Sequence, residues 1–81
     1  MLRSKIEILA DILEAARKGT TKTRIMSKAN LNQKLADPSI RLLTELKLIT
    51  EKKGTSVSYF TTASGFQFLE EYHRLEKTLE E

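Results

Sequence analysis

The chain has 81 residues, of which 40% are apolar and 31% are charged, and it contains no cysteine. A chain of this length forms one domain with a small core, so we expect no enclosed catalytic cavity. The lack of cysteine excludes disulfides, thiolate metal sites and a cysteine nucleophile, and the short apolar runs predict neither a membrane-spanning helix nor a signal peptide.

Charge is distributed unevenly along the sequence. The formal net charge is +3, but residues 1–16 carry −1, residues 17–53 carry +7 and residues 54–81 carry −3. A strongly basic block beside an acidic tail is typical of a protein with one face that meets a polyanion. The alternative is an ordinary lysine-rich surface in contact with solvent.

The first helix is predicted over residues 4–18. Ser4 and Glu7 have the spacing of a capping box, in which each side chain bonds the other residue's backbone. Gly19 is a typical residue at which such a helix ends. Apolar residues at helical spacing form the predicted core-facing side, which consists of Ile6, Ile8, Leu9, Ile12, Leu13 and Ala16.

A short second helix should run to about Lys28, with Thr20 or Thr21 as its N-cap. Its length makes it marginal in isolation. It therefore needs neighbouring helices to cover its inward residues, which are Ile25, Met26 and Ala29.

The third helical stretch covers residues 32–47, and Asn32 is its predicted cap. Pro38 conflicts with this pattern because an interior proline removes one backbone hydrogen bond. The pair Asp37 and Pro38 resembles a cap followed by a first-turn proline, so we expect either a kink or two helical pieces. The predicted inner face consists of Leu35, Ala36, Ile40, Leu43 and Leu46.

The periodicity then changes from helical to alternating. Residues 49–52 and 56–61 predict two short strands, rich in β-branched and aromatic residues. The turn between them contains Lys53 and Gly54, so the hairpin has a basic tip.

The last helix is predicted from about Ala63 to the end of the chain. Phe66 and Leu69 are expected to cover the core of the domain. Four further apolar residues are spaced by four, three and four, which is the a/d spacing of a coiled coil. A helix of this length spans roughly 30 Å and should project beyond the domain, so we expect a dimer interface made of Phe68, Tyr72, Leu75 and Leu79. The alternative is that these residues cap the chain's own core.

Three segments carry a resemblance to a known family: "TTKTRIMSKANLNQKL", "LLTELKLIT" and "YFTTASGFQFLEEY". They resemble the small archaeal winged helix-turn-helix DNA-binding proteins. This resemblance implies a mainly α fold with a small β-hairpin, a winged helix-turn-helix domain at residues 1–62 and a dimerisation helix at residues 63–81. It also implies that the last helix pairs with its mate in an antiparallel coiled coil.

In helix-turn-helix docking, the second helix of the motif lies in the major groove and the first crosses the phosphate backbone. Phosphate contacts are therefore predicted for Lys22, Arg24 and Lys28. Contacts to base edges or phosphates are predicted for Gln33, Lys34, Ser39 and Arg41. The wing should contribute Lys52, Lys53 and Thr55.

Each of these assignments has a structural alternative. The cations of the second helix and the wing could be an ordinary solvated surface, and Arg41 could pair with Glu45 one turn away. Asp37 would repel phosphate near the reading face, so its predicted role is helix capping.

The sequence therefore predicts a homodimer that binds double-stranded DNA, either as a transcriptional regulator or as a chromatin-associated protein. We expect it to be cytoplasmic and nucleoid-associated, without cofactor, metal or enzymatic activity; Glu70, His73 and Glu76 form only a weak metal pattern. The alternative function is a winged-helix module for protein interaction without DNA binding, and ligand sensing is a weaker third possibility.

Overall fold

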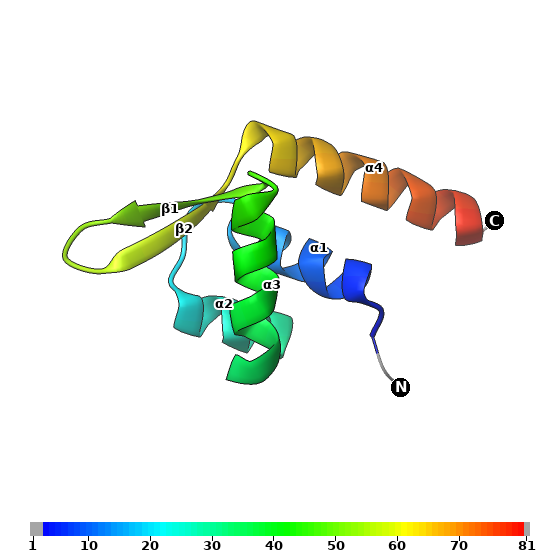
Figure 1. Cartoon of the computed structure of the whole chain (residues 1–81). Coiled ribbons are helices and arrows are strands. Elements are labelled where there is room, and N and C mark those ends of the chain that lie inside the picture. The colour runs from blue at the N-terminus through cyan, green and yellow to red at the C-terminus, as the bar shows by residue number, and fades with distance from the viewer. Residues whose placement is uncertain (1–2, 81) are drawn as a thin grey trace.

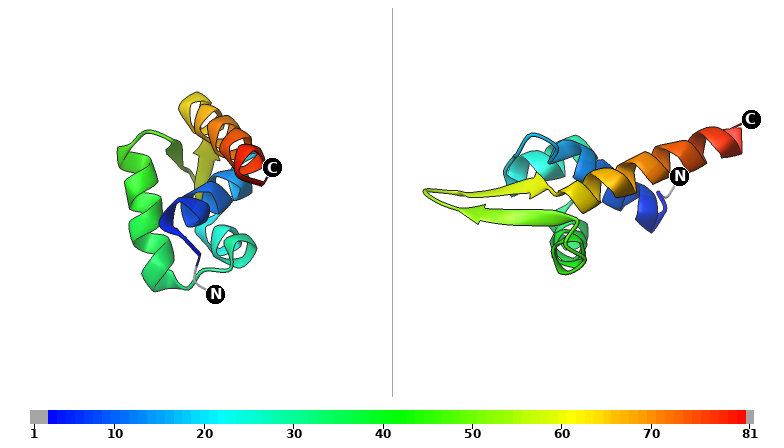
Figure 2. Two further views of the ribbon diagram at one scale, coloured as in Figure 1. Left: turned by 90° about the vertical axis from the view of Figure 1, so that its right-hand side faces the viewer. Right: turned by 90° about the horizontal axis from the view of Figure 1, so that it is seen from above.

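The computed structural model describes residues 3–80. Its elements in chain order are α1 (Lys5–Ala15), α2 (Lys22–Ala29), α3 (Gln33–Glu45), β1 (Ile49–Lys53), β2 (Val57–Thr61) and α4 (Ala63–Glu80) (Figure 1). The first three helices pack together, the hairpin extends from one end of them, and α4 extends toward the other end (Figure 2). The predicted mainly helical fold with one hairpin and a long C-terminal helix is confirmed.

Local capping signals set where the helices begin. Ser4 and Glu7 form the predicted capping box at the start of α1. The Thr21 hydroxyl accepts a bond from the backbone N–H of Arg24 at 3.3 Å, and the Asn32 side chain accepts one from Leu35 at 3.0 Å. All three predicted caps are confirmed, because each depends on residues only three positions apart.

The first helix is shorter than predicted, because α1 ends at Ala15 and not near Gly19. Gly19 lies instead in the following turn, with φ of 91°, and the ring of Phe60 occupies the space where a Cβ would be. The next residue, Thr20, pairs with Tyr59 of β2 through N–H···O bonds of 3.0 and 2.7 Å. This bridge fixes the connection between α1 and α2 to the base of the wing.

The two strands form an antiparallel hairpin whose register pairs Ile49 with Thr61 and Lys53 with Val57. Both strands match their predicted positions to within one residue. Residues of a strand alternate between its two faces, so Tyr59 lies on one face of the hairpin while Ser58 and Phe60 lie on the other.

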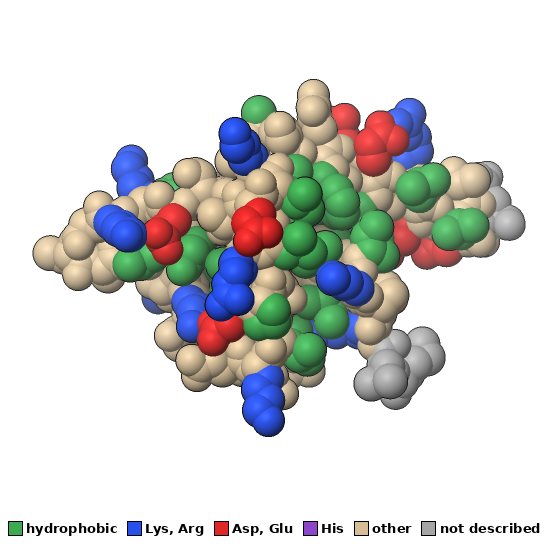
Figure 3. All heavy atoms as spheres, in the orientation of Figure 1, with side chains coloured by type: hydrophobic (Ala, Val, Ile, Leu, Met, Phe, Trp, Pro, Cys, Tyr) green, Lys and Arg blue, Asp and Glu red, His purple; other side chains and the backbone are tan. Residues whose placement is uncertain are grey.

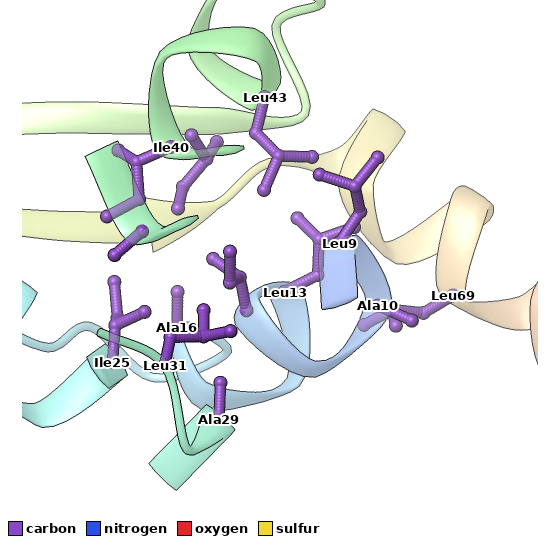
Figure 4. Packing of buried hydrophobic residues seen from close by; sticks show 13 residues of the cluster. Leu9, Ala10, Leu13, Ala16, Ile25, Ala29, Leu31, Ile40, Leu43 and Leu69 are labelled. Carbon is purple, nitrogen blue, oxygen red and sulfur yellow. The ribbon is translucent and has the colours of Figure 1, made fainter. Parts of the chain in front are cut away.

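The core lies between α1, α2, α3, the base of the wing and the first half of α4 (Figure 4). Ile12 and Leu13 of α1 are fully buried at its centre. The hydroxyl of Thr61, the buried polar residue of the core, donates to the backbone oxygen of Leu13 at 2.7 Å. The buried apolar residues are Leu9, Ala10, Ile12, Leu13, Ala16, Ile25, Ala29, Leu31, Ala36, Ile40, Leu43, Ile49 and Leu69.

Four residues predicted to face the core are exposed instead. Only the central row of α3 is buried, and Leu35 and Leu46 lie to one side of it with exposed fractions of 46% and 54%. Ile6 is 48% exposed near the start of α1. Phe66 is 38% exposed, and the guanidinium of Arg17 lies 5.4 Å from the centre of its ring. The predicted core-facing sets of these helices therefore contained more residues than the fold buries.

Of the two outcomes expected at Pro38, a kink or two helical pieces, the second is wrong, since α3 is one continuous helix from Gln33 to Glu45. Pro38 is exposed, and its missing N–H leaves the carbonyl of Lys34 without an intrahelical donor. Water can bond this carbonyl on the exposed side of the helix.

Candidate nucleic-acid interface

The outward face of α3 is the side opposite its buried row of Ala36, Ile40 and Leu43. The 3.6-residue helical period places Lys34 and Arg41 on this face, and both are exposed. Asp37, Pro38 and Glu45 lie beside them. The predicted reading helix thus presents cations and carboxylates together.

A hollow of about 410 Å³ separates this face of α3 from the wing. Its walls come from α2, α3 and both strands, and its residues carry charges of both signs. The Tyr59 hydroxyl donates to Glu51 at 3.3 Å, and the Nζ of Lys53 is 3.9 Å from the same carboxylate. The hollow is lined by Lys22, Asp37, Ile40, Arg41, Thr44, Glu45, Glu51 and Tyr59.

Asp37 was predicted to cap a helix, and this prediction is wrong because Asn32 caps α3. Asp37 instead forms an ion pair with Lys22 of α2 across the hollow. The hydrogen bond from Lys22 is the main reason why the pKa of Asp37 is lowered from its ordinary value. Lys22 is therefore a partly exposed cation held by an ion pair, and Asp37 partly neutralises the face beside Arg41.

Tyr59 contributes a phenol to the same hollow. Its partial burial, followed by the nearby charge of Glu51, raises the pKa of this hydroxyl above its ordinary value. Tyr59 therefore stays neutral near pH 7 and acts as a hydrogen-bond donor at the foot of the wing.

A second hollow lies on the opposite face of the hairpin. Arg24 of α2 and Lys18 of the preceding turn both line it. On that face, the Nζ of Lys52 lies 5.9 Å from the centre of the Phe60 ring. Sequence reasoning assigned no role to Lys18, because only the bridge between Thr20 and Tyr59 brings its turn beside the wing. The second hollow is lined by Lys18, Gly19, Thr20, Thr21, Arg24, Ser58 and Phe60.

The wing tip is an exposed part of the predicted interface. Lys53 has 79% of its side chain exposed, and Thr55 is exposed beside it. Figure 3 shows Lys and Arg side chains spread over the wing and α3 with carboxylates between them, so the face is a mixture of charges and not a uniform basic surface.

Two predicted DNA-binding residues, Lys28 and Ser39, line other grooves of the molecule. Lys28 lies beside Asp11 and Glu14 of α1. Ser39 lies on the flank of α3 that faces α1, where it shares a groove with Ile8 and Leu42. Gln33, at the start of α3, is exposed.

The predicted dimer residues of α4 divide into two pairs. Phe68 and Tyr72 are half-buried and pack against the chain's own core, as the alternative interpretation of this stripe expects. Leu75 and Leu79 lie further along α4 and are 58% and 84% exposed.

Residues 3–80 contain neither a metal-binding cluster nor a helix that could span a membrane. The exposed His73 and Glu76 are 3.5 Å apart, but within these residues no three His, Cys, Asp or Glu side chains are placed to hold a metal ion. None of the described helices combines the length and apolar character needed to cross a membrane.

Comparison with known families gives a match that covers almost the whole chain. A model described as "Winged helix-turn-helix" matches residues 2–80. The chain belongs to this winged helix-turn-helix family. A comparison with curated protein sequences finds no match.

Several solved structures share the fold of this winged-helix chain. Sso10a-2, a DNA-binding protein from Sulfolobus solfataricus, is 23% identical with a TM-score of 0.82, over 96% of this chain and 86% of that one. A winged-helix DNA-binding protein from STIV is 21% identical with a TM-score of 0.79, over 98% and 94%. MepR, a transcription regulator of a Staphylococcus aureus multidrug efflux pump, is 18% identical with a TM-score of 0.77, over 94% and 58%.

Proposed function

We propose that this winged-helix chain binds double-stranded DNA, with α3 in the major groove and the wing against the neighbouring backbone or groove. The observation that carries the proposal is the arrangement of Lys34 and Arg41 on the outward face of α3, next to a hairpin with the exposed cation Lys53 at its tip. Two similar structures are described as DNA-binding proteins and a third as a transcription regulator, which supports the same function.

Each predicted contact has a role that follows from its position. Arg41 and Lys34 would bond guanine edges or phosphates. Lys53 and Thr55 would contact the sugar-phosphate backbone beside the wing. Phosphate contacts would position the protein, and only base contacts would select a sequence.

The second hollow adds cations that would contact the same backbone. Arg24, Lys18 and Lys52 surround the opposite face of the hairpin. A duplex that curves around the wing would meet them, whereas a straight duplex would meet mainly α3. Lys22 would reach phosphate only if it leaves Asp37, and the roles of Gln33 and Lys28 stay predictions. Ser39 lies on the flank of α3 that faces α1, so we do not propose it as a DNA contact.

We also propose that the protein acts as a homodimer, joined through the exposed end of α4. Leu75 and Leu79 are large apolar side chains that the chain itself leaves uncovered, and such residues mark an interaction surface when they are contiguous. Two copies would present two reading helices to DNA, and their spacing would set the distance between half-sites.

Fluorescence anisotropy with a labelled random duplex tests the DNA-binding proposal. The double variant Lys34→Glu with Arg41→Glu should weaken binding by roughly 100-fold, because each lost contact costs about 1–3 kcal/mol. The matched control is Lys77→Glu, which reverses an exposed charge on the distant end of α4 and should have little effect. Equal affinity of the double variant and the wild type would refute the proposed interface.

The same assay separates the two biological roles that the fold allows. A regulator should bind a selected site at least about 10³-fold more tightly than random duplex, whereas a chromatin-associated protein should bind many sequences with similar, salt-sensitive affinity. Selection of duplexes from a random pool would reveal the preferred site, if one exists.

A further inference from the structure

We infer that the flank of α3 facing α1 is a second helix-pairing surface, which takes the distal half of α4 from a second copy of this chain. We call this surface the α3 flank and define it as Leu35, Ser39, Leu42 and Leu46. The inference rests on the proposed dimer and names the surface that each α4 meets.

The α3 flank has the residue spacing of a coiled-coil seam. Its members are separated by four, three and four residues, which is also the spacing of Phe68, Tyr72, Leu75 and Leu79 on α4. The buried row of α3 is a different set, made of Ala36, Ile40 and Leu43. This helix therefore carries one apolar stripe for the core and a second stripe beside it, of which only Leu42 packs partly against the core.

The second stripe forms one wall of an open groove. Ile8, Lys5 and Arg3 form the facing wall, and the groove has a volume of about 490 Å³. Leu35 and Leu46, near the two ends of the flank, are 46% and 54% exposed. Figure 3 shows apolar side chains gathered in a band beside α3 that continues toward α4. The groove and the exposed end of α4 thus belong to one face of the molecule.

The area needed for a stable dimer favours a second copy as the occupant. An interface of standard size buries about 800 Å² on each partner. Phe68 and Tyr72 already pack on their own core, so pairing of α4 with α4 alone would rest mainly on Leu75 and Leu79. If each α4 instead lies on the α3 flank of the other copy, Leu75 and Leu79 meet a longer apolar stripe, and the two-fold symmetry of a dimer makes that contact twice.

Charge complementarity supports the same occupant. The groove has the cations Arg3 and Lys5 on its wall, of which Arg3 already pairs with Asp11, and Lys47 follows Leu46 at the end of the flank. Among residues 3–80, neither Lys5 nor Lys47 takes part in an ion pair, and both are exposed. The distal half of α4 carries Glu76 and Glu80 beside its leucines, which are the charges that a basic groove would select.

This arrangement would link dimerisation directly to DNA binding. One side of α3 would contact the second copy while its outward face contacts the duplex. The second copy would therefore fix the angle and the spacing of the two reading helices.

Cysteine cross-linking tests this contact in the full chain, which has no native cysteine. Copies with Leu35→Cys or Leu46→Cys are mixed with tagged copies carrying Leu75→Cys or Leu79→Cys, and are then oxidised. At least one of these four mixtures should give a disulfide-linked mixed dimer. The control Val57→Cys, on an exposed apolar residue of the wing, should give none with either α4 variant. If all four mixtures match this control, the inference is overturned.

Sedimentation equilibrium provides the second measurement. The flank variant Leu35→Ser with Leu46→Ser and the α4 variant Leu75→Ser with Leu79→Ser should each raise the dimer dissociation constant at least about tenfold. The control Val57→Ser should leave it unchanged, and circular dichroism should show that every variant is folded.

The outcomes separate the two proposals. If the flank variant keeps the wild-type dissociation constant while the α4 variant becomes monomeric, the α3 flank is not the docking surface and the dimer proposal stands. If the wild-type protein is monomeric at all concentrations, the dimer proposal and this inference both fail. Neither result decides whether the outward face of α3 binds DNA, which the anisotropy assay measures separately.

Discussion

The two long sides of α3 differ in the partners of the side chains found there. On the side that faces the wing, Asp37 pairs with Lys22, and Glu51 accepts a bond from Tyr59. On the side that faces α1, Leu35 and Leu46 are about half exposed, with a groove beside them. Charged groups can stay hydrated until a ligand arrives, whereas clustered exposed leucines are unfavourable unless something covers them. One helix thus carries a charged side and an apolar side, which we propose meet DNA and a second copy respectively.

The largest effect is expected from a substitution that detaches α3 from the core, since it would disrupt both sides of this helix. Leu43 anchors α3 in the core and is fully buried, so Leu43→Ala should lower the free energy of unfolding by about 2–5 kcal/mol. Leu46→Ala, three residues along the same helix, should change the unfolding free energy of the monomer by less than about 0.5 kcal/mol. Urea denaturation at a concentration that keeps the protein monomeric measures both values, and equal losses would contradict the assigned orientation of α3.

A second pair of substitutions compares the two sides of α3 in DNA binding. Arg41→Ala should weaken duplex binding by about 1–3 kcal/mol, because it removes a cation from the outward face. Ser39→Ala lies on the α3 flank and should have no direct effect on that affinity. Anisotropy titrations at one fixed salt concentration compare the two variants. A larger loss for Ser39→Ala would reverse the roles assigned to the two sides.

The α3 flank can also be strengthened at its one polar position. Ser39 interrupts the row of leucines, so Ser39→Leu should tighten self-association by about tenfold if a second copy covers this side, because it adds apolar area to the seam. Sedimentation equilibrium measures the change. An unchanged dissociation constant for Ser39→Leu would count against a covered flank, while DNA affinity per dimer should stay near the wild-type value.

The smallest expected effect concerns the ion pair beside the wing. Lys22 lowers the pKa of Asp37 in the folded protein. The ion pair therefore stabilises the fold fully at pH values above the pKa that Asp37 has in the unfolded chain. This stabilisation is lost as the pH falls through the lower pKa of the folded state. Lys22→Ala should therefore raise the pKa of Asp37 toward its ordinary value. An NMR titration of the Asp37 side chain measures the shift, and Lys77→Ala serves as a distant control. No difference between these variants would show that the pair does not form in solution.

Features with local causes could be predicted well from the sequence. The caps Ser4, Thr21 and Asn32 each bond a backbone N–H three residues further on, so their signals lie within one turn of helix. The hairpin was equally clear, because alternation and turn residues are short-range patterns. These elements fix the fold, and the family match agrees with it.

The site was harder to predict because its contacts join distant segments. Asp37 bonds Lys22 of another helix, and Lys18 reaches the second hollow through the bridge between Thr20 and Tyr59. Helical spacing alone also could not tell whether Leu35 faces the core or the neighbouring groove, since both directions lie on the apolar half of α3. Only the placement of α1 decides this, and periodicity contains no information about that placement.

The dependence of duplex affinity on salt tests the central claim most directly. If Lys34, Arg41, Lys53 and the cations of the second hollow meet phosphates, each contact releases counterions and contributes about −0.9 to the slope of log K against log salt concentration. With Arg24, Lys18 and Lys52 of the second hollow these are six contacts, so a straight line with a slope of about −5 is the predicted result. An affinity for duplex DNA that does not change with salt, or no measurable binding at low salt, would contradict the account.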